Sequence, residues 1–231
     1  MNFYPQNEWR HWHAFHNSWA TYLSSQLNAR LPAGYFAEAN VQYGIEIDVA
    51  TFAEERVDPI DLGWAPPAPQ LSVPVAMSGP VVEVGIFSRS GGPELAGAIE
   101  LVSPANKDRL GHRDAFVSKC ASYLQAGIGL VIVDVVTERM ADLHTELLTR
   151  LGVTTVGTGS LLSTSAYLVA ERDETPNLDI WHEPLAVGQK LPTMPLWLRG
   201  GLCLPVELQE TYERTCREQK VLPAAPHGTI T

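Results

Sequence analysis

The stretch GAIELVSPANK, residues 97–107, combines the pattern of a buried strand with a charge that such a strand should not carry. In an extended strand, Ile99 and Leu101 point to one face, while Glu100 points to the other between two apolar neighbours. A Ser-Pro turn follows immediately. We therefore predict a glutamate at a buried position, where an unpaired charge would cost several kcal/mol.

The two elements after this stretch make it part of an α/β unit. Residues 113–127, RDAFVSKCASYLQAG, carry apolar side chains at helical spacing and end at Gly127. Residues 129–136, GLVIVDVV, are almost continuously apolar, which is typical of a strand buried on both faces. A strand–helix–strand unit favours a parallel pair. We therefore predict an interior strand at 129–136, beside the strand of Glu100.

Periodicity predicts the remaining elements. They are a helix over Trp12–Leu31, strands at 35–43 and 45–52, an extended Pro-rich connection through 64–74, a hairpin of 81–87 with 95–103, a helix over Arg139–Leu151, a strand at 165–173 and a terminal helix at 206–219. The predicted fold class is α/β, with a single mixed β-sheet flanked by helices. We expect a single domain over residues 1–231, with a core at about 12–173 and a C-terminal helical extension at about 206–219.

Composition and charge limit the function classes. Hydrophobic residues make up 45% of the chain and charged residues 18%, so we expect a sizeable core rather than disorder. The net charge of −10 counts against a large non-specific nucleic-acid surface but permits a local basic groove. The sequence contains no run of about 18 apolar residues, so we predict no membrane span. The N-terminus has no apolar export segment, and the cysteines have no metal or redox spacing, so we expect a cytoplasmic protein.

Three further polar features need an explanation. Asp48 shares a strand face with Ala50 and Phe52, and Lys119 lies at the edge of the apolar stripe of its helix. Composition and spacing alone favour a structural Lys–Glu ion pair, with a functional site as the alternative. The third feature is a group of histidines at positions 11, 13 and 16, for which packing and surface roles are favoured over a metal site.

The segment IELVSPANK, followed by KCASYLQAGIGLVIVD, resembles a bacterial domain-of-unknown-function family with an IExxSPxNK block. It is also similar to the Uma-type proteins, which carry a VExLSPS block and a K-x-x-x-Y-x-x-x-G helix. Lys119, Tyr123 and Gly127 match that helix, and Asp134 matches the aspartate that ends the next strand. The similarity covers most of the chain and is strongest over residues 95–136. Uma-type proteins are assigned to the PD-(D/E)XK nuclease superfamily, whose core is α-β-β-β-α-β; the order predicted here is compatible with that core plus one added strand.

The resemblance implies a site in which two acidic side chains on adjacent strands hold Mg²⁺ or Mn²⁺. Such a metal and a lysine act together on water and on the scissile phosphate. Glu100 corresponds to the glutamate of the (D/E)XK half-motif. Asp48 is the best candidate for the preceding aspartate, with Glu83 as the alternative because the strand at 81–87 follows that of Asp48.

The chain also departs from the superfamily pattern. The usual lysine position, two residues after Glu100, is Val102. Lys119 on the following helix is the leading replacement, and Lys107 in the SPANK turn is the second. No proline precedes Asp48 to complete the "PD".

Three function classes follow. The first is a Mg²⁺-dependent nuclease that hydrolyses DNA or RNA with a migrated lysine and binds nucleic acid through a local cleft. The protein could be a monomer or a homodimer. The alternative is a catalytically inactive nuclease-fold protein that serves as a binding or regulatory module, which the missing motif lysine and the acidic charge favour. The third is an unrelated housekeeping role in which Ser103 and Asn106 only cap a structural turn.

Overall fold

The computed structural model describes residues 9–43, 45–53, 63–75, 94–154 and 160–221. The helices are α1 (Trp9–Asn28), the short 3-10 helix η1 (Pro104–Lys107), α2 (Leu110–Gln125), α3 (Leu143–Arg150) and α4 (Leu208–Glu218). The strands are β1 (Tyr35–Tyr43), β2 (Ile45–Ala53), β3 (Leu71–Pro74), β4 (Glu94–Leu101), β5 (Gly129–Asp134), β6 (Ser163–Arg172), β7 (Thr175–Pro184), β8 (Thr193–Trp197) and β9 (Cys203–Glu207).

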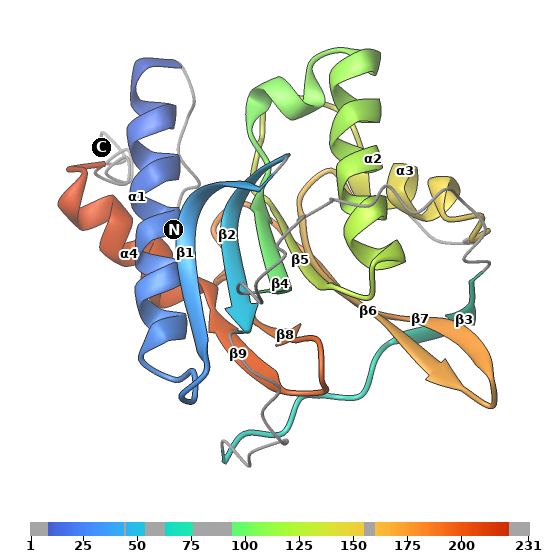
Figure 1. Ribbon diagram of the computed structural model, residues 1–231. Helices are drawn as coiled ribbons and strands as arrows, with labels where there is room; N and C mark the ends of the chain where they lie inside the picture. Colours follow the sequence, from blue (N-terminus) through green and yellow to red (C-terminus); the bar gives the residue numbers. More distant parts are fainter. Residues whose placement is uncertain (1–8, 44, 54–62, 76–93, 155–159, 222–231) are drawn as a thin grey trace.

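Seven strands form one mixed sheet in the order β1-β2-β4-β5-β6-β7-β3 (Figure 1). Strands β4 and β5 run parallel and are joined through α2, whereas the other neighbouring strands of this sheet run antiparallel. This confirms the α/β class with a mixed sheet flanked by helices. Strand β5 is buried along its whole length between β4 and β6, which confirms the interior strand expected at 129–136.

The sheet separates two clusters of buried apolar side chains. Alternate residues of β4 and β5 point to opposite faces, so Ile99 and Val131 join one cluster while Ala98 and Leu130 join the other. Helices α1 and α4 contribute to the first cluster, and α2 and α3 to the second. Figure 1 shows the two helix pairs on opposite sides of the molecule. Glu100, between Ala98 and Val102, therefore belongs to the face that α2 covers.

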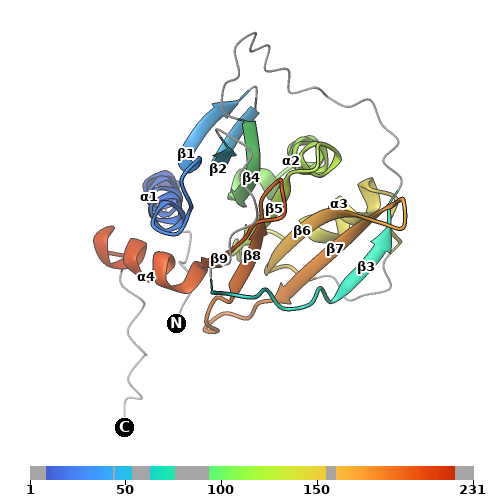
Figure 2. The ribbon, with the colours of Figure 1, turned by 60° about the horizontal axis from the view of Figure 1, so that its bottom comes forward.

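Strands β8 and β9 form a separate two-stranded sheet that the sequence did not predict. Strand β8 packs against β4, β5 and β6 (Figure 2). This approach is so close that a Cβ at Gly129 would lie 1.9 Å from the carbonyl oxygen of Trp197. The backbone N–H of Arg199 continues the contact by donating to the carbonyl of Ala96 at 2.8 Å. Glycine at position 129 is therefore required by packing.

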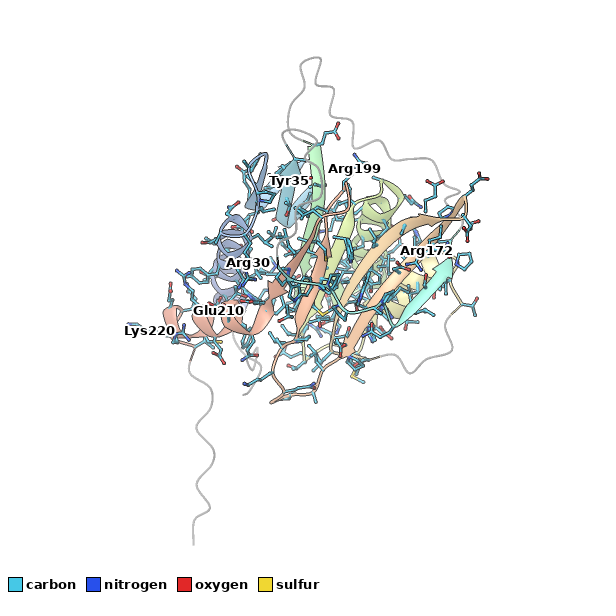
Figure 3. The ribbon with its side chains drawn as sticks, turned by 90° about the horizontal axis from the view of Figure 1, so that it is seen from below. Arg30, Tyr35, Arg172, Arg199, Glu210 and Lys220 are labelled. Atoms are coloured by element: carbon cyan, nitrogen blue, oxygen red, sulfur yellow. The ribbon has the colours of Figure 1, made fainter. Side chains whose placement is uncertain are left out.

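The C-terminal part of the chain also holds α1 in place. Arg30, labelled in Figure 3, donates to Oε1 of Glu207 at 2.6 Å and to the carbonyl of Pro205 at 3.2 Å. The indole N–H of Trp19 donates to the Thr211 hydroxyl of α4 at 3.0 Å. The predicted C-terminal extension thus packs on the first helix and helps to fix its orientation.

Some expected boundaries need correction. The main sheet continues beyond residue 173, because β7 pairs along the whole of β6. Residues 71–74, predicted as part of an extended connection, form the edge strand β3 against β7. The expected partner of the 95–103 strand, residues 81–87 with Glu83, lies outside the described residues; within them, β4 pairs with β2 and β5.

Candidate functional site

The candidate site lies where β2 and β4 separate. The ladder between these strands ends at the pair Val49 and Ile99, and the next residues are Asp48 and Glu100. Beyond this point the backbone N–H of Leu101 donates to Oδ2 of Asp48 at 2.7 Å, so a side chain takes over from the strand ladder. The end of the ladder therefore places two carboxylates beside each other on neighbouring strands.

Both members of this pair are buried, and Glu100 is the deeper one, with 1% of its surface exposed against 8% for Asp48. Its Oε2 accepts a hydrogen bond from Nζ of Lys119 at 2.6 Å, and its Oε1 accepts one from the hydroxyl of Tyr123 at 3.2 Å. Burial raises the pKa of Glu100, Lys119 opposes this and Asp48 adds to it, leaving the pKa at about 7. Its position in the core therefore keeps the pKa of this glutamate well above its ordinary value.

Lys119 reaches this carboxylate from α2. Its Nζ also donates to the backbone carbonyl of Glu46 on β2 at 3.1 Å, and it lies 5.4 Å from the ring centre of Phe116. Burial lowers the pKa of Lys119, but the Glu100 carboxylate outweighs it, so the pKa is raised. The ammonium group stays charged, and 18% of the side chain is open to solvent.

His16 of α1 is a member of the site that the sequence did not identify. Its Nε2 lies 3.1 Å from the carbonyl oxygen of Leu101 and 3.4 Å from Oδ2 of Asp48. Burial lowers the pKa of His16, but Asp48 and the Leu101 carbonyl together raise it above its usual value. The spacing of the helix residues could have pointed to His16. It follows Trp12 by four residues and precedes Trp19 by three, which places it beside the apolar stripe of the helix.

Lys107 belongs to a different cluster. Its Nζ lies 2.9 Å from Oδ2 of Asp134 and donates to the carbonyl of Leu161 at 2.7 Å. Burial raises the pKa of Asp134 to about 6, although Lys107 lowers it. Of the two lysines considered from the sequence, the structure thus brings Lys119 to Glu100 and places Lys107 at the end of β5. Glu83, the alternative first carboxylate, lies outside the described residues.

The chemistry of the donor atoms decides whether a divalent cation fits here. Among the described residues, no group of three or more His, Cys, Asp or Glu side chains is arranged to hold a metal. Mg²⁺, however, is usually held by one or two carboxylates, with water and substrate phosphate completing its coordination. The carboxylates of Asp48 and Glu100 and the carbonyl of Leu101 are oxygen donors of this kind. The residues therefore fit a cation with few protein ligands.

Comparisons with protein-family models, curated proteins and solved structures find no match to this chain. Within the described part of the chain, none of the helices has the length and apolar character to span a membrane. The function is therefore inferred from the site itself.

Proposed function

We propose that this chain hydrolyses phosphodiester bonds in DNA or RNA with a bound divalent cation, Mg²⁺ or Mn²⁺. The observation that carries the proposal is the convergence of Asp48, Glu100 and Lys119 at the end of the β2–β4 ladder. These side chains come from two strands and a helix that are far apart in the chain. Two carboxylates with a charged lysine match the requirements of metal-assisted phosphodiester hydrolysis.

The order of elements supports the same proposal. The order α1-β1-β2-β4-α2-β5, taken without η1 and without β3 at the far edge of the sheet, is compatible with the α-β-β-β-α-β core of the superfamily that the chain resembles. Lys119 reaches Glu100 from the helix that follows the glutamate strand. A lysine on α2 can thus approach the carboxylate although Val102 occupies the usual position.

Each residue has a role in the proposed reaction. Asp48, Glu100 and the carbonyl of Leu101 would hold the cation, which would polarise the phosphate and lower the pKa of the attacking water. The ammonium group of Lys119, at the partly open side of the site, would stabilise negative charge that develops on the phosphate oxygens. The same positive charge favours the ionised form of Glu100. The hydroxyl of Tyr123 keeps the other carboxylate oxygen in place.

Cleavage assays on single- and double-stranded DNA and RNA, with Mg²⁺ and with Mn²⁺, test this proposal. Lys119→Met and Glu100→Gln preserve side-chain size, and each should lower cleavage by about 100-fold or more. Lys190→Met and Glu171→Gln are matched controls at exposed positions and should retain full cleavage. Wild-type protein that cleaves none of the four substrates, or Lys119→Met protein as active as wild type, would contradict the proposal.

A catalytically inactive binding or regulatory module is the second candidate. The observation that favours it is that both oxygens of Glu100 already have protein partners, Lys119 and Tyr123. In that case Lys119 only neutralises a buried carboxylate, and Lys119→Met would leave that carboxylate without its charged partner. A wild-type protein without cleavage, together with a Lys119→Met variant whose free energy of unfolding falls by about 3 kcal/mol or more, would decide for this candidate.

A further inference from the structure

The position of His16 bears on which cation the site selects. Its Nε2 approaches two oxygens, Oδ2 of Asp48 and the carbonyl of Leu101, and both belong to the cation donors of the proposed function. The His16 side chain is 14% exposed. Its ring is therefore largely buried and lies next to these two oxygens.

The distances between these atoms match those between neighbouring ligands of one metal ion. In an octahedral site with bonds of about 2.1 Å, adjacent donor atoms are roughly 3.0 Å apart. The separations of Nε2 from the Leu101 oxygen and from Oδ2 of Asp48 are 3.1 and 3.4 Å. The His16 nitrogen therefore lies at separations from both oxygens that are close to those of atoms sharing one cation. One of the three is a backbone oxygen, so this set differs from a group of three side chains.

The surroundings of His16 hold the ring in this orientation. Helix α1 is anchored by Trp12 and Trp19, which are buried one turn before and about one turn after the histidine. Trp12 is 6% exposed and Trp19 is 1% exposed, so the helix is fixed on both sides of the histidine.

We propose that His16 is a direct ligand of the divalent cation, together with Asp48 and the Leu101 carbonyl, and that the site therefore selects Mn²⁺ over Mg²⁺. This inference rests on the proposed metal-dependent function. Imidazole nitrogen is a good ligand for transition metals, whereas Mg²⁺ prefers oxygen and gives up its water reluctantly. A mixed set of one nitrogen and several oxygens fits Mn²⁺.

Pulsed electron paramagnetic resonance of Mn²⁺ bound to the wild-type protein tests the inference directly. The spectrum should contain a coupling to imidazole nitrogen that changes when histidine is labelled with ¹⁵N. The coupling should disappear in His16→Gln and persist in His13→Gln, a control at an exposed position on the same helix. In calorimetry, His16→Gln should weaken Mn²⁺ binding by at least about tenfold and change Mg²⁺ binding much less.

The outcomes separate this inference from the function on which it rests. Mn²⁺ that binds without a nitrogen coupling, or with a coupling that survives in His16→Gln, would overturn the role of His16 and leave the carboxylate site intact. An equal loss of Mn²⁺ and Mg²⁺ binding in His16→Gln would also overturn it, because His16 would then act by positioning Asp48. Wild-type protein that binds neither cation would contradict the metal-dependent function itself.

Discussion

Two buried lysine–carboxylate pairs in the described part of the chain differ in how completely they are enclosed. The Lys107 side chain has no exposed surface, and Asp134 has 5%. The ammonium group of Lys107 contacts both carboxylate oxygens and the carbonyls of Val136 and Leu161. Lys119, in contrast, keeps 18% of its side chain exposed above a glutamate that is 1% exposed. One pair is closed to a ligand and the other is partly open.

The difference shows how similar charges can serve different purposes. Removing two charges from water is costly, so a pair that is fully enclosed needs every donor and acceptor satisfied. The Lys107–Asp134 pair meets this requirement and connects η1 to the end of β5 and to the segment at Leu161. The Lys119–Glu100 pair lies near Asp48 and is partly open to solvent, so it is not enclosed in the same way.

The largest effect is expected from Lys107→Met. This change leaves the Asp134 carboxylate buried without its partner, and it should lower the free energy of unfolding by about 3–5 kcal/mol. Urea unfolding measures the loss. Lys190→Met, at an exposed position, should change stability by less than about 0.5 kcal/mol. Equal stability of the two variants would show that the Lys107–Asp134 pair does not contribute to the stability of the fold.

The titration of Glu100 should appear in the stability of the metal-free protein. Burial, opposed by Lys119, raises the pKa of Glu100 to about 7, above its ordinary value of 4.5. Between these pH values the folded protein holds a proton that the unfolded chain has released, so stability falls as pH rises. Relative to Glu100→Gln, the wild type should lose on the order of 3 kcal/mol from pH 4.5 to 7.

Unfolding of both proteins in urea with a chelator, at several pH values, measures this difference. Asp134 titrates in an overlapping range, but it is present in both proteins and cancels. A stability difference that stays constant with pH would mean that Glu100 is already ionised throughout the range. A wild type that gains stability relative to Glu100→Gln would reverse the sign of the pKa shift.

The smallest effect is expected from Lys119→Met on stability. Glu100 can respond by taking up a proton, because its pKa is already close to 7, and Tyr123 still contacts it. The loss should be about 1–2 kcal/mol, clearly less than for Lys107→Met measured in the same way. Equal losses for the two lysine variants would remove the distinction between the enclosed pair and the open one.

Local sequence patterns predicted much of the fold. The helical spacing in residues 113–127 and the apolar run at 129–136 predicted α2 and β5, because each pattern depends only on nearby residues. The burial of Glu100 also followed from its apolar neighbours, and with it the need for a partner. Strands β7, β8 and β9 were not predicted, because each contains proline, which is depleted in strands, although β7 pairs with the preceding β6 and β8 with the following β9.

The candidate site was only partly predictable, because its residues come from segments that are far apart in the chain. The residue types indicated that Glu100 needs a positively charged partner. Lys107 and Lys119, seven and nineteen positions further along the chain, were both candidates for that partner. Asp48 and His16 lie farther away in sequence, and nothing local ties either of them to Glu100. Their approach depends on the pairing of β2 with β4 and on the packing of α1.

By itself, the sequence determined the α/β class, the interior strand at 129–136 and the presence of a buried carboxylate. Each of these follows from the pattern of apolar and polar residues that are close together in the chain. Only the tertiary structure decided that Lys119 pairs with Glu100, that Lys107 pairs with Asp134 and that His16 joins Asp48. The physical reason is that charged partners are selected by distance in space. That distance is set where the β2–β4 ladder ends and where α1 and α2 pack on either face of the sheet.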